Sequence, residues 1–279
     1  MEPVTLPIIS RIATPPSLYS AIRRVEEKHP FLRDRAWLND DLEAKLTELS
    51  GALATGSFQA QQVSFFYAMN DKPLRCASLD CRTWIAHEAI YGVLTDYFTD
   101  KWVEDCTFQP NQAEHLLTRC REWKQRRAWV AGADIRRFFD SVQHKILLDA
   151  LTPEVPCPVT LRLIAGFLEA FDRASFEFTA IEPNHVHQPG KGLPAGVELV
   201  YLLVHLLLKP IDLKMKTLSS GHYGRYLDDF LFFTDDPDTL YAAAHELEST
   251  LSLLGLELNP SKTFFQSCAV PIHFLRSTI

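Results

Sequence analysis

Long apolar runs are missing from this sequence of 279 residues, and its polar N-terminus has no signal-peptide pattern. The longest candidate, residues 197–208, is interrupted by Glu198 and His205. It falls short of the roughly 20 apolar residues that span a bilayer. We therefore expect a cytoplasmic protein that makes no membrane contact.

Paired cysteines are missing as well. The six cysteines are scattered, and none belongs to a Cys-x-x-Cys motif or to a ladder of Cys and His residues. This spacing excludes the usual zinc sites and is typical of a reduced, cytoplasmic protein.

An excess of positive charge is the third absence. The formal net charge is −7, whereas general nucleic-acid binders are usually basic. Nucleic-acid binding is not excluded, because clustered basic residues act locally. Such binding should nonetheless be weak without a bound cation, or rely on a partner.

The most informative segment is residues 221–233, where two apolar and aromatic runs flank Asp228-Asp229. This pattern predicts a β-hairpin with the two acids at its tip. Adjacent carboxylates raise each other's pKa unless a cation neutralises them. Two interpretations remain open: a divalent metal site, or a solvated turn in which Asp is favoured for its local hydrogen bonds.

A third acid ends an upstream apolar segment. Residues 128–134 predict a buried strand that finishes at Asp134. If this strand is a neighbour of the hairpin, the three carboxylates form an oxygen-only cluster. Such a cluster suits Mg²⁺ or Mn²⁺ and does not suit zinc.

Five segments, spread over about residues 60–279, resemble the motifs of bacterial reverse transcriptases in order and in approximate spacing. They are Asp134-Ile135-Arg136-Arg137-Phe138-Phe139-Asp140-Ser141-Val142, Lys191-Gly192-Leu193-Pro194-Ala195-Gly196, Tyr226-Leu227-Asp228-Asp229, Leu254-Gly255-Leu256-Glu257-Leu258-Asn259-Pro260-Ser261-Lys262-Thr263 and His273-Phe274-Leu275-Arg276. The resemblance is closest in style to the defence-associated and abortive-infection enzymes. Ala195 stands where the family usually has Gln, and the usual downstream Ser-Pro is absent.

The resemblance implies an α/β (α+β) fold: a right-hand polymerase with palm and fingers, whose antiparallel palm sheet packs on helices. We expect an N-terminal helical arm at residues 1–55, fingers at 56–125 interleaved with the palm, and the palm at 126–279. Within the arm, Asn39 is expected to cap a helix. The thumb is expected to be short or absent, so that a protein partner or a homo-oligomer supplies the missing grip.

The implied activity is RNA-directed or untemplated DNA polymerisation, a nucleotidyl transfer with two Mg²⁺ or Mn²⁺ ions. The carboxylates of Asp134, Asp228 and Asp229 and the backbone carbonyl of Ile135 are the expected metal ligands. The expected partners are a dNTP substrate, an RNA template and a nucleic-acid primer. The same resemblance suggests a role in antiphage defence.

It further implies a set of nucleotide-binding residues: Arg75, Lys72, Phe139, Ala195, Gly196 and Lys262. Arg75 and Lys72 would hold the triphosphate on a hairpin of strands 61–67 and 74–79. Lys72 is a substitute, because Met69 stands where the family has a lysine. Arg75 is otherwise a surface arginine of a strand.

Within the same set, Phe139 would exclude a 2′-hydroxyl, and Lys262 would lend charge or a proton to the leaving pyrophosphate. Phe138 and Phe139 would point to opposite faces of a strand, one into the core and one toward the sugar. Core packing and a plain strand-start lysine are the alternatives. Ala195 and Gly196 would form the loop that contacts template and nucleotide.

Two other interpretations remain. An RNA-dependent RNA polymerase shares the palm, but Tyr226 and Phe139 argue against it. An inactive palm subunit that assembles with a polymerase or an RNA is favoured by Met69, Ala195 and the negative charge. It is opposed by the three carboxylates, because a scaffold has no physical need for mutually repelling acids.

Overall fold

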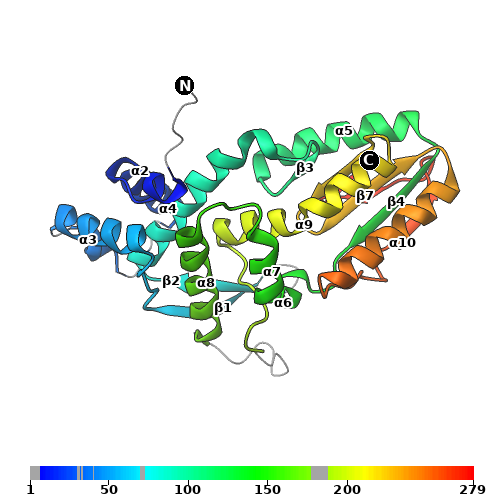
Figure 1. Cartoon of the computed structure of the whole chain (residues 1–279). Helices are drawn as coiled ribbons and strands as arrows, with labels where there is room; N and C mark the ends of the chain where they lie inside the picture. The colour runs from blue at the N-terminus through cyan, green and yellow to red at the C-terminus, as the bar shows by residue number, and fades with distance from the viewer. Residues whose placement is uncertain (1–6, 30–31, 33, 40, 70–72, 177–187) are drawn as a thin grey trace. The chain divides into compact units, whose positions relative to one another are not determined.

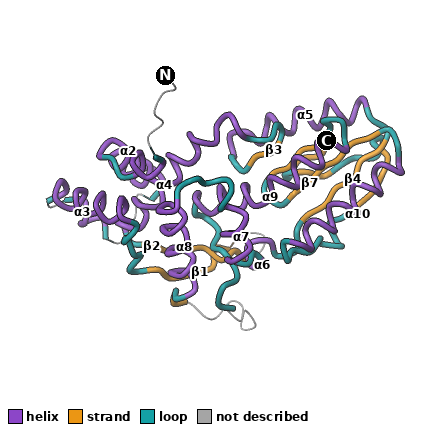
Figure 2. Tube along the Cα trace, in the orientation of Figure 1, coloured by secondary structure: helices purple, strands orange, loops and turns teal. Residues whose placement is uncertain are grey.

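The computed structural model describes residues 7–29, 32, 34–39, 41–69, 73–176 and 188–279 (Figures 1 and 2). The chain divides into two compact units. The first unit comprises Met1–Asp100 and His144–Leu203, and the second comprises Lys101–Gln143 and Val204–Ile279. Both units combine helices with strands, which confirms the expected α/β class. The domain bounds expected from the sequence stay a prediction.

In the first unit, helices pack around a small three-stranded sheet. Strands β1 and β2 pair antiparallel from Val63↔Leu79 to Met69↔Pro73, so the expected hairpin is confirmed, and β5 pairs parallel to β1. The elements are α1 (Ile8–Ile12), α2 (Pro15–Lys28), η1 (Arg35–Leu38), α3 (Leu42–Thr55), β1 (Val63–Met69), β2 (Pro73–Leu79), α4 (Cys81–Phe98), η2 (Thr99–Lys101, which ends in the second unit), α7 (His144–Leu151), α8 (Pro158–Asp172) and β5 (Ser175–Phe176).

One helix start in this unit was predicted wrongly. Asn39 does not cap α3, because residues Arg35–Leu38 form the short 3₁₀ helix η1 and Asn39 ends it. Helix α3 instead begins at Leu42, after Asp41 in a left-handed conformation. A polar residue before an apolar run is a weak signal when two short helical segments compete for it.

The second unit is built on a five-stranded sheet with the order β3-β6-β7-β4-β8. β6 and β7 form the expected antiparallel hairpin, β4 pairs antiparallel with both β7 and β8, and β3 lies parallel to β6. The elements are β3 (Cys106–Thr107), η3 (Pro110–Gln112), α5 (Ala113–Arg126), β4 (Trp129–Asp134), α6 (Phe138–Ser141), most of α9 (Glu198–Leu218), β6 (Tyr223–Tyr226), β7 (Asp229–Thr234), α10 (Pro237–Leu253), β8 (Phe264–Ser267), β9 (His273–Phe274) and β10 (Ser277–Thr278).

Alternation along β7 gives this sheet two apolar faces. Leu231 and Phe233 join the core cluster that contains Trp123 of α5. Phe230 and Phe232 line a small apolar cavity with residues of α9 and α10. The sheet therefore lies between α5 on one face and α10 on the other (Figure 1).

Helices of the described ranges are all too short or too polar to cross a bilayer.

Candidate active site

The acid cluster forms where β4 and β7 lie side by side. Asp134, the last residue of β4, pairs directly with Asp229, the first residue of β7. Asp228 precedes Asp229 in the turn of the hairpin, and its carbonyl accepts a hydrogen bond from the N–H of Ile135 at 3.3 Å. The strands are therefore neighbours, which is the condition on which the three-carboxylate hypothesis depended.

Asp134 is held on two sides by the segment that follows α10. Asn259 donates its side-chain N–H to Asp134 Oδ1 at 2.9 Å, and its backbone N–H to the carbonyl of Asp134 at 2.8 Å. Lys262 forms an ion pair with Asp134 Oδ2. Lys262 thus lies at the acid cluster, and its contact with pyrophosphate stays a prediction.

Sequence reasoning did not single out Asn259. The signal was available in Asn259-Pro260-Ser261-Lys262, because an Asn followed by Pro and Ser is typical of a turn that the Asn side chain stabilises. Asn259 Oδ1 indeed accepts a hydrogen bond from the Ser261 hydroxyl at 2.8 Å. The turn brings Asn259 and Lys262 to the same carboxylate.

Burial and like charge make the cluster electrostatically unfavourable without a cation. Burial, together with Asp229 and Asp134, raises the pKa of Asp228 to about 7. Burial raises the pKa of Asp229 to about 6, where Asp134 adds to the increase and Lys262 opposes it. Burial lowers the pKa of Lys262, but the hydrogen bond to Asp134 and the charges of the three carboxylates raise it above its ordinary value overall.

The donor set fits a hard divalent cation, because it is made of carboxylate oxygens only. In the described part of the chain, no group of three or more His, Cys, Asp or Glu side chains is already arranged to hold a metal ion. Asp134 instead has both carboxylate oxygens engaged by Asn259 and Lys262.

A cavity of about 540 Å³ in the second unit is lined by Asp229 and Lys262. The segment His273–Arg276, which resembles the primer-grip motif, lines the same cavity. Asp229, Lys262 and the segment His273–Arg276 therefore line one cavity, which is large enough for part of a nucleotide.

Phe138 and Phe139 were expected on a strand, and this prediction was wrong. They begin the short helix α6, after Arg137 in a left-handed conformation. Phe138 is buried, Phe139 is half-buried, and their ring centroids are 5.3 Å apart. One ring is thus core, as expected, while the role of Phe139 against a sugar stays a prediction.

The remaining expected residues lie in the first unit. Arg75 is 6% exposed, and its Nη2 donates to the carbonyl of Leu193 at 3.3 Å. The N–H of Ala195 donates to the carbonyl of Arg75 at 2.8 Å. Arg75 therefore supports the loop that contains Ala195 and Gly196. Lys72 lies outside the described residues.

Glycine is required where this loop meets Arg75. Gly192 has φ +94°, and a Cβ there would lie 2.5 Å from Arg75 Nη2. The carbonyl of Gly192 also contacts His144 Nε2 at 2.9 Å, a support that the sequence did not indicate. The loop is thus held from both sides by buried polar side chains.

Comparison with known families decides the assignment. The family model described as reverse transcriptase (RNA-dependent DNA polymerase) matches residues 73–279. The chain belongs to this family. The description of this family names RNA-dependent DNA polymerisation, a nucleotidyl transfer, as its activity.

Two solved structures are similar to this reverse transcriptase, a "Partial Cas6-RT-Cas1--Cas2 complex" and a "Cas6-RT-Cas1--Cas2 complex". Each is 21% identical with a TM-score of 0.47, and each match covers 90% of this chain. The matches cover 42% and 26% of those chains, so this chain spans less than half of their length. A comparison with curated proteins finds no match.

Proposed function

We propose that this reverse transcriptase adds deoxynucleotides to a 3′-hydroxyl end by two-metal nucleotidyl transfer. The observation that carries the proposal is the direct pairing of Asp134 with Asp229, with Asp228 in the adjoining turn. Three carboxylates at one point are unfavourable unless cations join them, so their function is to bind cations.

Asp134, Asp228 and Asp229 would hold Mg²⁺ or Mn²⁺, with the carbonyl of Ile135 as a further ligand. When bound, the two ions stabilise the charge that develops on the attacking and leaving oxygens. Asn259 orients the carboxylate of Asp134 through its side-chain N–H. Lys262 supplies a positive charge next to the reacting phosphates.

In the second unit, Phe139 would contact the sugar of the nucleotide. In the first unit, the loop of Ala195 and Gly196 would contact template and nucleotide, as the family resemblance implies. Arg75 would contribute to triphosphate binding together with Lys72. In the described structure its guanidinium supports Leu193, so this role requires that the hydrogen bond be exchanged for a phosphate oxygen.

The test is incorporation of labelled nucleotide by wild type beside the double variant Asp228→Ala, Asp229→Ala. Asp235→Asn is the matched control, because Asp235 follows the other end of β7 and forms an ion pair with Arg127 at 2.5 Å. Each dNTP and rNTP is offered with Mg²⁺ or Mn²⁺, with and without primer and template. We expect product from wild type and Asp235→Asn only, and from dNTPs only.

No product from wild type under any condition would overturn the proposal. It would favour an inactive palm subunit that assembles with a partner polymerase or an RNA. Product without a template would identify untemplated synthesis.

We further propose a cytoplasmic role in antiphage defence, supported by the resemblance of the loop around Ala195 to that of defence-associated enzymes. Cells that carry an Asp228→Ala allele should lose protection against phage. Protection that persists in these cells, with the variant protein present at the normal level, contradicts this role.

A further inference from the structure

The turn that presents the acids has a strained conformation. Leu227, which immediately precedes Asp228, has φ +52°. A branched, non-glycine residue in the left-handed region is unfavourable and persists only when its surroundings fix it. Two hydrogen bonds do so: the Leu227 N–H donates to the carbonyl of Thr107 at 3.0 Å, and Arg225 Nη1 donates to the carbonyl of Leu227 at 2.8 Å.

Arg225 is itself held by a fully buried carboxylate. Its Nε donates to Asp212 Oδ1 at 2.7 Å and its Nη2 to Asp212 Oδ2 at 2.5 Å. Neither side chain of this pair is exposed at all. The planar guanidinium therefore has one orientation, with its remaining Nη1 directed at the turn.

Two further residues complete this buried network. His205 Nδ1 lies 3.1 Å from Arg225 Nη2, and the Tyr223 hydroxyl donates to Asp212 Oδ1 at 2.8 Å. Only a neutral His205 accepts a hydrogen bond from an arginine, which agrees with the lowering of its pKa by burial and by the charge of Arg225. Asp212 and His205 thus hold the guanidinium of Arg225 in a single orientation.

Stability alone does not explain the buried pair of Arg225 and Asp212, because apolar residues of similar volume often stabilise a protein as much as a buried ion pair does. What an apolar pair cannot do is hold the carbonyl of Leu227. We propose that Arg225, oriented by Asp212, is a positioning residue for nucleotidyl transfer that fixes the Leu227 turn and thereby aims Asp228 and Asp229. This inference rests on the proposed function of the acid cluster.

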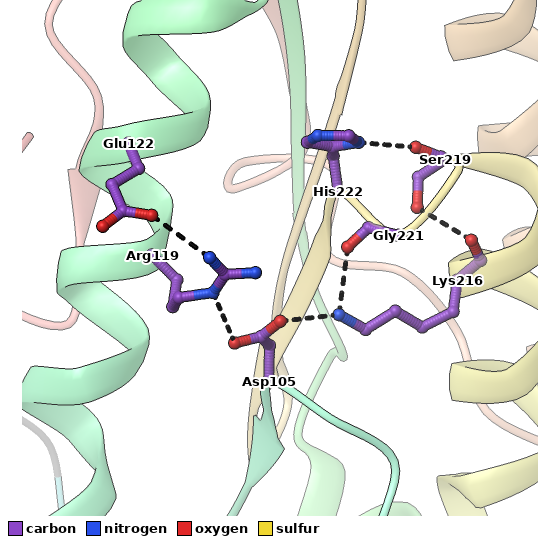
Figure 3. Close-up of polar contacts among 7 residues, drawn as sticks. All are labelled: Asp105, Arg119, Glu122, Lys216, Ser219, Gly221 and His222. Carbon is purple, nitrogen blue, oxygen red and sulfur yellow. Dashed lines mark hydrogen bonds and ion pairs between the residues drawn. The ribbon is translucent and has the colours of Figure 1, made fainter.

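A second ion-pair cluster in the same unit, formed around the buried carboxylate of Asp105, provides a control. The Asp105 carboxylate accepts hydrogen bonds from Arg119 at 3.3 Å and from Lys216 at 2.8 Å (Figure 3). This ion-pair cluster supports β6, because the carbonyl of Asp105 accepts the N–H of Arg225 at 3.0 Å. None of its side-chain hydrogen bonds is to the Leu227 turn. Lys216→Met therefore weakens a buried ion pair without removing the contact with Leu227.

The experiment compares Arg225→Lys, which keeps the charge and loses the fork, with Lys216→Met. We expect Arg225→Lys to lower kcat by about 10–100-fold, the range for residues that orient ligands from behind. The KM for dNTP should stay within about twofold, because the turn acts on chemistry and not on nucleotide binding. Arg225→Lys should also lose most of the rise in Tm that Mn²⁺ produces in wild type. Lys216→Met should lower Tm yet retain both kcat and the Mn²⁺ response.

A double variant, Arg225→Met with Asp212→Leu, separates positioning from packing, because it leaves neither charge buried alone. We expect its Tm to exceed that of Arg225→Met while its kcat stays low. Wild-type kcat in the double variant would overturn the inference. If wild type itself incorporates no nucleotide, the proposed function fails on its own, and the Mn²⁺ response still decides: its retention in Arg225→Lys overturns the positioning role and its loss supports it.

Discussion

Removing one charge from the acid cluster should stabilise the metal-free protein above about pH 4, with an effect that grows up to about pH 7. The pKa values of about 7 for Asp228 and about 6 for Asp229 lie above the ordinary value of 3.8. The folded state therefore binds protons more tightly than the unfolded state. The cluster costs little stability below about pH 4, its cost grows as the pH rises from about 4 to about 7, and it is constant at higher pH.

The magnitude follows from the pKa of Asp228. A rise from about 4 to about 7 disfavours the charged form by roughly 4 kcal/mol, and shared protonation with Asp229 lowers the recoverable part to about 2–3 kcal/mol. We expect Asp228→Asn to be more stable than wild type by that amount at pH 8, and nearly equal to it at about pH 3.5, below the ordinary pKa of 3.8. Urea unfolding in the presence of a chelator measures the difference at each pH.

The exposed Asp100 provides the control, since Asp100→Asn should match wild type at both pH values. Mg²⁺ at pH 8 should stabilise wild type and leave Asp228→Asn almost unchanged, because the cation relieves the same repulsion. An Asp228→Asn protein that is less stable than wild type at pH 8, or equally shifted at both pH values, would refute the reasoning.

Three further predictions concern other parts of the site. Phe139→Ala should raise the ratio of rNTP to dNTP incorporation by about tenfold or more in single-nucleotide assays. An unchanged ratio would contradict the role of Phe139 in excluding a 2′-hydroxyl. Gly192→Ala should lower the free energy of unfolding by about 2–3 kcal/mol. At Gly190, φ is +75° and an added Cβ would have no atom within 4 Å, so the control Gly190→Ala should lower the free energy of unfolding by only about 1 kcal/mol. Lys262→Met should shift the acidic limb of the pH–rate profile to higher pH, because Lys262 lowers the pKa of Asp228 and Asp229; an unshifted limb would contradict its place beside the acids.

The pattern of residues predicted the local structure of the palm well. The hairpin around Asp228 follows from two apolar runs around a polar tip. The start of α10 also has a local cause, because Pro237 begins the helix and Asp236 accepts the N–H groups of Asp238 and Thr239. These features depend on neighbours in sequence. The meeting of Asp134 with Asp229 needed one more assumption, that their strands pair, which the pairing confirms.

The supports of the site were not predictable in the same way. Asn259 reaches Asp134 across 125 positions, and Arg225 reaches Asp212 only because α9 and β6 pack together. A buried arginine in a strand also contradicts the usual expectation that charged residues are exposed. Phe138 was assigned to a strand because it continues an apolar run, but Arg137 adopts a left-handed conformation that ends the strand pattern.

Two residues three positions apart should respond oppositely to substitution, and this contrast follows from the physics of the turn. Asp228 contributes repulsion to the metal-free fold, so its neutral variant gains stability. Arg225 holds the strained Leu227 and a buried carboxylate, so its variants lose stability. General damage to the hairpin would instead lower the stability of the protein in both variants. If the stability rises in the Asp228 variant and falls in the Arg225 variant, while both lose nucleotide incorporation, two conclusions follow. The acids destabilise the metal-free fold, and Arg225 holds them in place for the reaction.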